Sequence, residues 1–257
     1  MTALPEPPFR TVQAPAAWNA VDLISDLHLQ AAEPATFAAW QRYLQQTPAD
    51  AVFILGDLFE VWVGDDAAQA SSFAADCAAV LRAASRARPL FFMHGNRDFL
   101  VGPALMQSAG ATLLHDPAVL DFAGTRWLLT HGDALCLADT DYQRFREQVR
   151  SSDWQRDFLA LPLGQRLSLA RHLRSESEAR KPRDGAYADV DGPAADAWLD
   201  AAGASVFVHG HTHRPAQHRL PSGRQRIVLS DWDAAAIPPR SEALRLTAAG
   251  MQRIALA

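Results

Sequence analysis

The sequence predicts an α/β fold in which layers of strands and helices alternate, with one helical insertion. Short apolar, β-branched and aromatic runs recur along the chain, and the first of them are separated by segments of helical periodicity. The last part of the chain carries the pattern of a closing hairpin, which predicts a mixed sheet. With 257 residues, of which 49% are hydrophobic and 21% charged, the chain can bury a sizeable core.

Six apolar runs are short enough for buried strands, and amphipathic segments follow the first two. Phe37, Trp40 and Leu44 recur at helical spacing after the first run, and a second apolar stripe begins at Phe73. Residues 243–246 and 251–256 flank a turn and predict the hairpin. The predicted strands are residues 21–24, 51–55, 90–93, 127–129, 206–208 and 227–229.

A basic segment interrupts this alternation. Residues 150–183 hold eight basic and four acidic residues, a net +4 in a chain of net −5. Apolar residues at helical spacing begin at Trp154 and again at Leu163. We therefore expect a helical cap insertion over about residues 140–190, within a domain of residues 19–257. Residues 1–18, rich in Pro and Ala, are expected to form a loose leader.

Composition excludes several classes of function. The chain has 24 basic and 29 acidic residues, which argues against a nucleic-acid partner because phosphate binding needs surplus cations. Cys77 and Cys136 have no metal-site or disulfide spacing, as expected of a cytosolic protein. No apolar run approaches the ~18 residues of a spanning helix. Any membrane contact is expected to be peripheral, and no obligate protein partner is inferred.

Polar side chains that can bind metals follow five of the predicted strands. In open α/β sheets, ligands bind beyond the carboxyl ends of the strands, so these groups are expected to converge. One Asp in such a place is more often a helix cap or turn residue, but five clusters in order have a low false-positive rate. The seven side chains are Asp26, His28, Asp57, Asn96, His131, His211 and His213.

Carboxylate, amide and imidazole donors without thiolates suit a divalent cation such as manganese, iron or zinc. Seven donors are too many for one catalytic metal with an open coordination position, but they suit two metals about 3.5–4 Å apart. Asp57, alone in its Gly-Asp turn, is the expected bridging ligand. The residues alone therefore predict a two-metal phosphoester or pyrophosphate hydrolase, with water as the nucleophile.

The motifs Asp26-x-His28, Gly56-Asp57, Gly95-Asn96, His131 and Gly210-His211-x-His213 resemble the signature of the calcineurin-like metallophosphoesterases. The resemblance extends from residue 23 to residue 213. It implies their fold, two packed mixed β-sheets flanked by helices. It also implies two ligand sets that share Asp57: Asp26, His28, Asp57 and His213 for one metal, and Asp57, Asn96, His131 and His211 for the other.

Arg97 narrows the resemblance to one family, because most members of that superfamily have His at this position, directly after the Asn that corresponds to Asn96. Together with the sequences around Glu60, Asp133 and Asp189, it makes the chain similar to the UDP-2,3-diacylglucosamine pyrophosphohydrolases of lipid A biosynthesis. That family uses Mn²⁺ and acts at the cytoplasmic face of the bacterial inner membrane, as a peripheral protein. The resemblance implies water attack on the nucleotide phosphorus of the lipid substrate, giving UMP and 2,3-diacylglucosamine 1-phosphate.

The resemblance also suggests roles for individual residues. The expected catalytic residues are Asp57, Asn96, Arg97 and His131, with the Arg97 guanidinium binding the second phosphate. The expected substrate contacts are Asn96, Arg97, Asp139, Ser177, Arg180, Arg183 and His211.

The cap is expected to cover the acyl chains, with its arginines reaching the sugar phosphate or anionic lipid headgroups. The alternative for the cap is a solvated basic helix packed on the core. Two other functions stay open at this point. One is another metallophosphoesterase activity, such as that of a nucleotide phosphodiesterase or a protein phosphatase, and the other is a non-catalytic scaffold.

Overall fold

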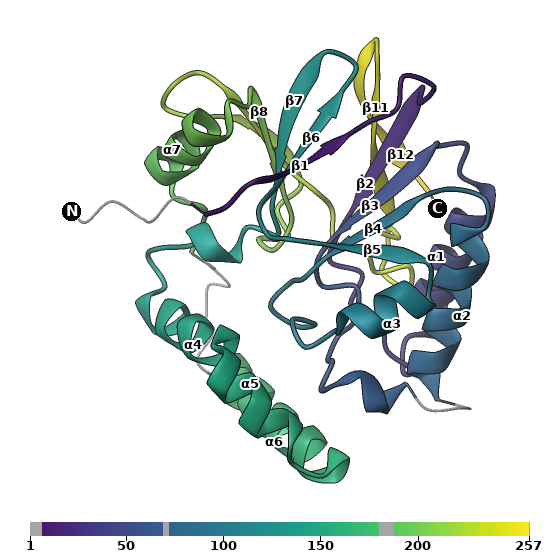
Figure 1. Cartoon of the computed structure of the whole chain (residues 1–257), viewed down its shortest axis with the longest axis vertical. Helices are drawn as coiled ribbons and strands as arrows, with labels where there is room; N and C mark the ends of the chain where they lie inside the picture. Colours follow the sequence, from purple (N-terminus) through teal and green to yellow (C-terminus); the bar gives the residue numbers. More distant parts are fainter. Residues whose placement is uncertain (1–6, 69–71, 180–187, 257) are drawn as a thin grey trace.

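Two β-sheets pack face to face and carry helices on their outer sides (Figure 1). The computed structural model describes residues 7–68, 72–179 and 188–256, and of residues 174–179 it describes only the helical backbone. Within this part of the chain each sheet has six strands. The predicted architecture of two packed mixed sheets flanked by helices is confirmed.

The first sheet has the strand order β12-β11-β2-β3-β4-β5. Its parallel strands are β2 (Ala20–Ile24), β3 (Ala51–Leu55), β4 (Leu90–Met93) and β5 (Ala111–Leu114). The antiparallel hairpin of β11 (Glu242–Thr247) and β12 (Gly250–Ala255) completes one edge. Parallel neighbours need crossovers, which α1 (Pro34–Gln46), α2 (Phe73–Ser85) and α3 (Pro103–Ser108) provide.

The second sheet has the order β1-β6-β7-β8-β10-β9. Three of its pairs are parallel, namely β1 with β6, β7 with β8, and β8 with β10. The other two pairs are antiparallel. The strands are β1 (Arg10–Gln13), β6 (Ala118–Phe122), β7 (Thr125–Leu129), β8 (Val206–His209), β9 (Ala216–Arg219) and β10 (Gln225–Val228).

Strand alternation divides the core into layers. Along β2 and β3, Leu23 and Phe53 pack between the sheets, whereas Ile24 and Ile54 pack under α1 and α2. Helix α7 (Gly192–Ala202) covers the outer face of the second sheet. Strands buried on both faces have near-continuous apolar sequences, which is why these runs could be recognised from the sequence.

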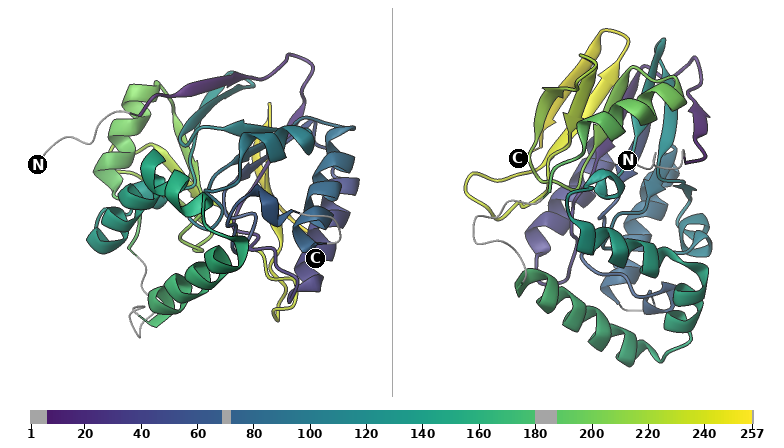
Figure 2. Two further views of the ribbon diagram at one scale, coloured as in Figure 1. Left: turned by 60° about the horizontal axis from the view of Figure 1, so that its bottom comes forward. Right: turned by 90° about the vertical axis from the view of Figure 1, so that its left-hand side faces the viewer.

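The cap consists of α4 (Thr140–Arg150), α5 (Ser152–Leu159) and α6 (Leu163–Ala179), which extend from one end of the sandwich (Figure 1). Figure 2 shows the same three helices from two other sides. Short 3₁₀ turns, η1 (Asp65–Ala67) and η2 (Asp133–Leu135), lie in the connections. Among the described residues, no helix is both long and apolar enough to cross a bilayer.

The structure corrects part of the predicted outline. Residues 10–13, expected in a loose leader, form β1 and pair with β6. Four strands were not predicted: β1, β5, β6 and β9. β1 and β9 lie at sheet edges and carry mostly exposed polar side chains, so they lack the apolar alternation on which the prediction depended.

Candidate metal centre

The loops that follow β2, β3, β4, β7 and β8 bring the seven predicted ligands to one end of the sandwich. Among the described residues, six other than glycine have a positive φ, and five of these are predicted ligands. Such backbone costs about 1–3 kcal/mol per residue and persists only where the surroundings enforce it, typically at functional sites. The five φ angles are 55° at Asp26, 49° at His28, 52° at Asp57, 65° at His211 and 50° at His213.

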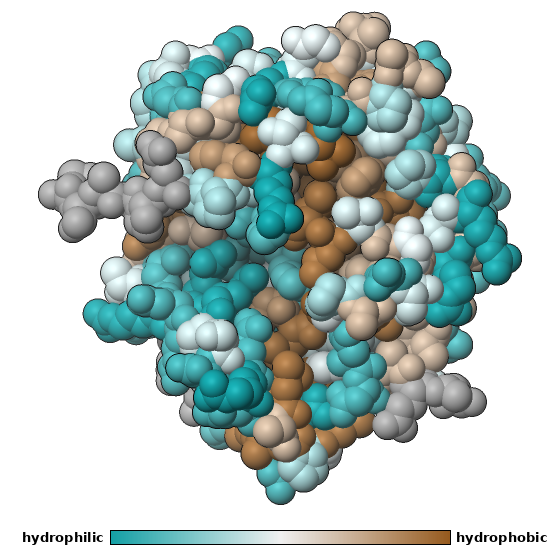
Figure 3. All heavy atoms as spheres, in the orientation of Figure 1, coloured by the Kyte–Doolittle hydropathy of each residue, from teal (hydrophilic) through white to brown (hydrophobic). Residues whose placement is uncertain are grey.

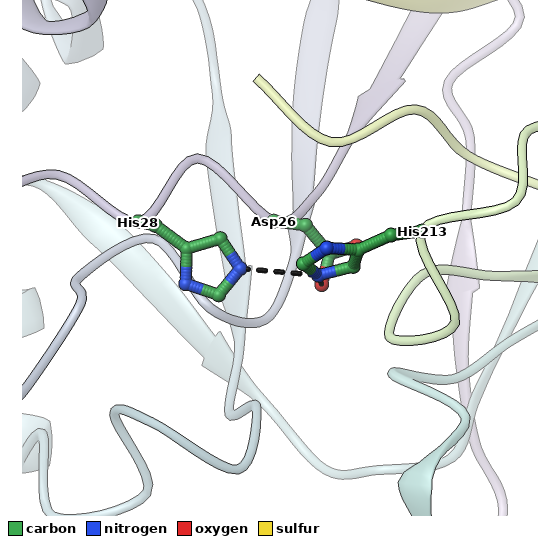
Figure 4. Close-up of side chains that lie close together, drawn as sticks. All are labelled: Asp26, His28 and His213. Carbon is green, nitrogen blue, oxygen red and sulfur yellow. Dashed lines mark hydrogen bonds and ion pairs between the residues drawn. The ribbon is translucent and has the colours of Figure 1, made fainter. Parts of the chain in front are cut away.

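Asp26, His28 and His213 form the first group of predicted ligands (Figure 4). The Nε2 atoms of the two histidines are 3.2 Å apart, and His213 Nε2 is 3.4 Å from Asp26 Oδ1. On the far side of the first ring, His28 Nδ1 lies 2.8 Å from Glu60 Oε2. Glu60 thereby orients the ring so that Nε2 faces the group, as partners of metal-bound histidines commonly do.

Asn96, His131 and His211 form the second group. Asn96 Oδ1 lies 2.8 Å from His131 Nε2 and 2.8 Å from His211 Nδ1, so three potential donor atoms converge. His131 Nδ1 lies 2.9 Å from the Leu55 carbonyl oxygen, to which it can donate. This contact leaves Nε2 of the fully buried His131 as the atom that can bind a metal.

Asp57 lies between the two groups. Its Oδ2 is 4.0 Å from His28 Nε2 and 3.7 Å from His131 Nε2. Its Oδ1 instead accepts the Arg97 backbone N–H at 2.8 Å. One oxygen of the carboxylate therefore faces both groups, as a bridging ligand requires.

The electrostatics of the site match a cation-binding role. Burial would lower the pKa of His131, but the carboxylates of Asp57, Asp26 and Asp133 raise it to about 9. Burial and the neighbouring His131 lower the pKa of His211 to about 4. Buried charges in proteins are paired or coordinate metals, so an acidic, imidazole-rich cluster of this kind fits divalent cations.

A buried carboxylate that sequence analysis gave no role, Asp98, joins two of the ligand loops. It accepts backbone N–H groups from Gly95 at 2.8 Å, Leu58 at 2.8 Å and Phe59 at 3.3 Å. A Cβ atom at Gly95 would collide with the Asp57 carboxylate, so only glycine allows this close approach.

No role was predicted from the sequence for Glu60 either. The signal for both Asp98 and Glu60 is an acidic residue two or three positions after a predicted ligand, which is also common in turns.

The predicted substrate residues lie in different surroundings. Arg97 is 24% exposed at the site, with NH1 3.9 Å from Glu60 Oε1. Asp139 is exposed and caps α4, because its side chain accepts the Tyr142 backbone N–H. Ser177 lies in residues 174–179 of α6, of which only the backbone is described, and Arg180 and Arg183 lie outside the described residues.

Arg166 departs from the expectation that the arginines of the cap reach the sugar phosphate or lipid headgroups. This residue is 2% exposed and pairs with the Asp66 carboxylate. Arg156 pairs on the surface with Asp153 and Asp157 of its own helix. A guanidinium buried against the core needs fixed acceptors, so Arg166 attaches the cap to the loop after Trp62.

Comparisons with known proteins agree with this geometry. The family model described as calcineurin-like phosphoesterase matches residues 20–215. A protein of Ralstonia nicotianae named UDP-2,3-diacylglucosamine hydrolase is 46% identical over 88% of both chains. Proteins of the same name are 46% identical in Xanthomonas axonopodis pv. citri, over 81% of this chain and 90% of the relative, and 44% identical in Shewanella piezotolerans, over 81% and 88%. The chain therefore belongs to the calcineurin-like phosphoesterase family, in the branch that these relatives represent.

Proposed function

We propose that this chain hydrolyses the pyrophosphate bond of UDP-2,3-diacylglucosamine and releases UMP and 2,3-diacylglucosamine 1-phosphate. The observation that carries the proposal is the convergence of seven side chains with oxygen or nitrogen donors, Asp57 and six others, of which five lie on left-handed backbone. The name of the relatives supports the substrate. A pyrophosphate linked to a nucleoside and an acylated sugar fits a site in which Arg97 lies beside a cluster of predicted cation ligands.

The donor set fits two divalent cations, which we propose to be Mn²⁺. Asp26, His28 and His213 would hold one, Asn96, His131 and His211 the other, and Asp57 both. When bound, such a pair activates water and neutralises phosphoryl oxygens. Oxygen and imidazole ligands without thiolates suit manganese, iron or zinc, and the proposal of Mn²⁺ among these rests on the resemblance to the lipid A family.

The residues of the chain would then position and neutralise the substrate. Glu60 and the Leu55 carbonyl hold two imidazoles with Nε2 facing inward, so the site is arranged before substrate arrives. The Arg97 guanidinium would bind the phosphate that leaves with the sugar and stabilise its developing charge. A departing phosphomonoester needs little protonation at neutral pH. A permanent cation can therefore stand where other phosphoesterases have His.

Hydrolysis in ¹⁸O-labelled water tests the reaction. With Mn²⁺ and UDP-2,3-diacylglucosamine, we expect one label in UMP and none in the sugar phosphate, because water attacks the nucleotide phosphorus. Mass spectrometry of both products gives the answer, and protein treated with a chelator is the control. Label in the sugar phosphate would disprove the proposed point of attack, and an absence of turnover would disprove the activity.

Replacing Arg97 tests its proposed contact with the second phosphate. Arg97→Met should lower kcat by about 10²–10³-fold, equivalent to about 2.7–4 kcal/mol, as removal of a preorganised charge donor does. The matched control is Arg144→Met, since Arg144 is 78% exposed and pairs with Asp141 on α4. A kcat within a factor of about three of the wild type would refute the role of Arg97.

We also propose peripheral binding to lipid at the cytoplasmic face of the inner membrane. Five large apolar side chains of the cap are at least one-third exposed, and apolar surface reaches the lower end of the molecule in Figure 3, where the cap lies. Such side chains can bury apolar area in a lipid surface. The five are Phe145, Leu159, Leu167, Leu169 and Leu173.

Co-sedimentation with phosphatidylglycerol vesicles tests the lipid contact. Substituting Ser at Leu167, Leu169 and Leu173 together should weaken vesicle binding by about tenfold or more, because each Leu loses apolar area that lipid would cover. Ile237→Ser is the control, since Ile237 is 99% exposed but lies outside the cap. Equal binding of the wild type and the triple variant would exclude this surface.

A further inference from the structure

Helix α4 is attached to the protein mainly by polar contacts. Val149 is the one buried residue of the helix, so no apolar stripe holds it in place. Tyr142, Arg146 and Arg150 follow one another at intervals of four and therefore share a face. Each of the three contacts a loop that carries a proposed metal ligand.

The first contact is made through Asp133, two residues after His131. The fully buried Asp133 carboxylate accepts the Tyr142 hydroxyl at 2.6 Å and Arg146 Nε at 2.8 Å, and Arg150 NH2 lies 3.8 Å away. Gln143 adds a hydrogen bond from its side-chain amide to the Asp133 carbonyl oxygen at 2.8 Å. The loop that carries His131 is thereby fastened to α4.

The second and third contacts reach the other two loops. Arg150 NH2 donates to the carbonyl oxygen of Gly95, the residue before Asn96, at 2.9 Å. Its guanidinium also lies 5.2 Å from the centre of the Phe99 ring. The Tyr142 ring stacks on His211, with 6.0 Å between ring centres and 30° between ring planes.

One helix therefore braces all three members of the second ligand group. The contacts described for α4 include none with Asp26, His28 or His213. We propose that Asp133 and Arg150 are positioning residues that set the affinity of one metal position, the one formed by Asn96, His131 and His211, and leave the other nearly unaffected. This inference rests on the proposed two-metal centre and deepens it.

The arrangement also couples the cap to the metals. If α4 favours the geometry that binds one cation, then binding of that cation must favour the docked position of α4 by the same free energy. Docking of α4 and binding of the metal are thus thermodynamically coupled, although α4 supplies none of the seven predicted ligands.

Calorimetric titration of the metal-free protein with Mn²⁺ tests the proposal. The wild type should bind two ions. Arg150→Met should keep one site at wild-type affinity and weaken the other by about 10–100-fold, the usual effect of removing a residue that orients a ligand. Electron paramagnetic resonance of Mn²⁺ gives a readout independent of activity, because the signal of a coupled pair should give way to that of an isolated ion.

Matched variants separate positioning from general damage. Arg144→Met, on the exposed side of the same helix, should leave both affinities unchanged, and Arg150→Lys, which retains a donor for the Gly95 carbonyl, should recover part of the lost affinity. If Arg150→Met does not fold, Arg150→Lys and Asp133→Asn are titrated in its place, with a loss again expected at one site.

Equal weakening of both sites, or no weakening at either, would overturn the proposal while leaving the two-metal centre intact. A wild type that binds fewer than two ions would instead overturn the two-metal centre and the inference with it.

Discussion

The Asp57 carboxylate must face histidines that come from different sheets, and this constraint governs the rest of the site. His28 follows a strand of the first sheet and His131 a strand of the second, yet both Nε2 atoms lie within 4.0 Å of the same Asp57 oxygen. The carboxylate reaches that point from left-handed backbone, with φ at 52°. The packing of the two sheets and the strained loop must therefore both place the Asp57 carboxylate at this point.

Several groups enforce the strained geometry. Asp98 fastens the backbone after Asp57 to Gly95, and the Arg97 N–H holds the second Asp57 oxygen. The Trp232 N–H similarly fixes the carbonyl oxygen of Asp26, which lies far earlier in the chain. Buried hydrogen bonds of this kind replace solvent as partners and make the loops rigid before any ligand binds.

The sequence predicted those parts of the molecule that leave a local pattern. Strands β2, β3 and β4 are largely buried, so each is a mainly apolar run, and a predicted ligand follows two or three residues after its end. By contrast, the partner of Arg166 is Asp66, one hundred positions earlier, and that of Asp133 is a helix of the cap. Distant pairs of charged residues have no periodicity, and each member alone resembles an ordinary surface residue.

Charge is unevenly distributed over the molecule, so the net charge does not describe the site or the cap. The chain has a net charge of −5, but Asp26 and Asp57 are buried at a site that divalent cations would neutralise. The described cap arginines mostly bind protein groups, so the positive segment contributes attachment to the core as well as surface charge. Arg97 lies beside the predicted ligand groups, near Glu60.

Anomalous diffraction at the manganese absorption edge, from crystals of the chain grown with Mn²⁺, shows whether Asp57 lies between two metal positions. Two peaks about 3.5–4 Å apart are expected. One should lie among Asp26, His28 and His213, the other among Asn96, His131 and His211, with the Asp57 carboxylate between them. A single peak, or peaks away from these groups, would contradict the proposed two-metal centre.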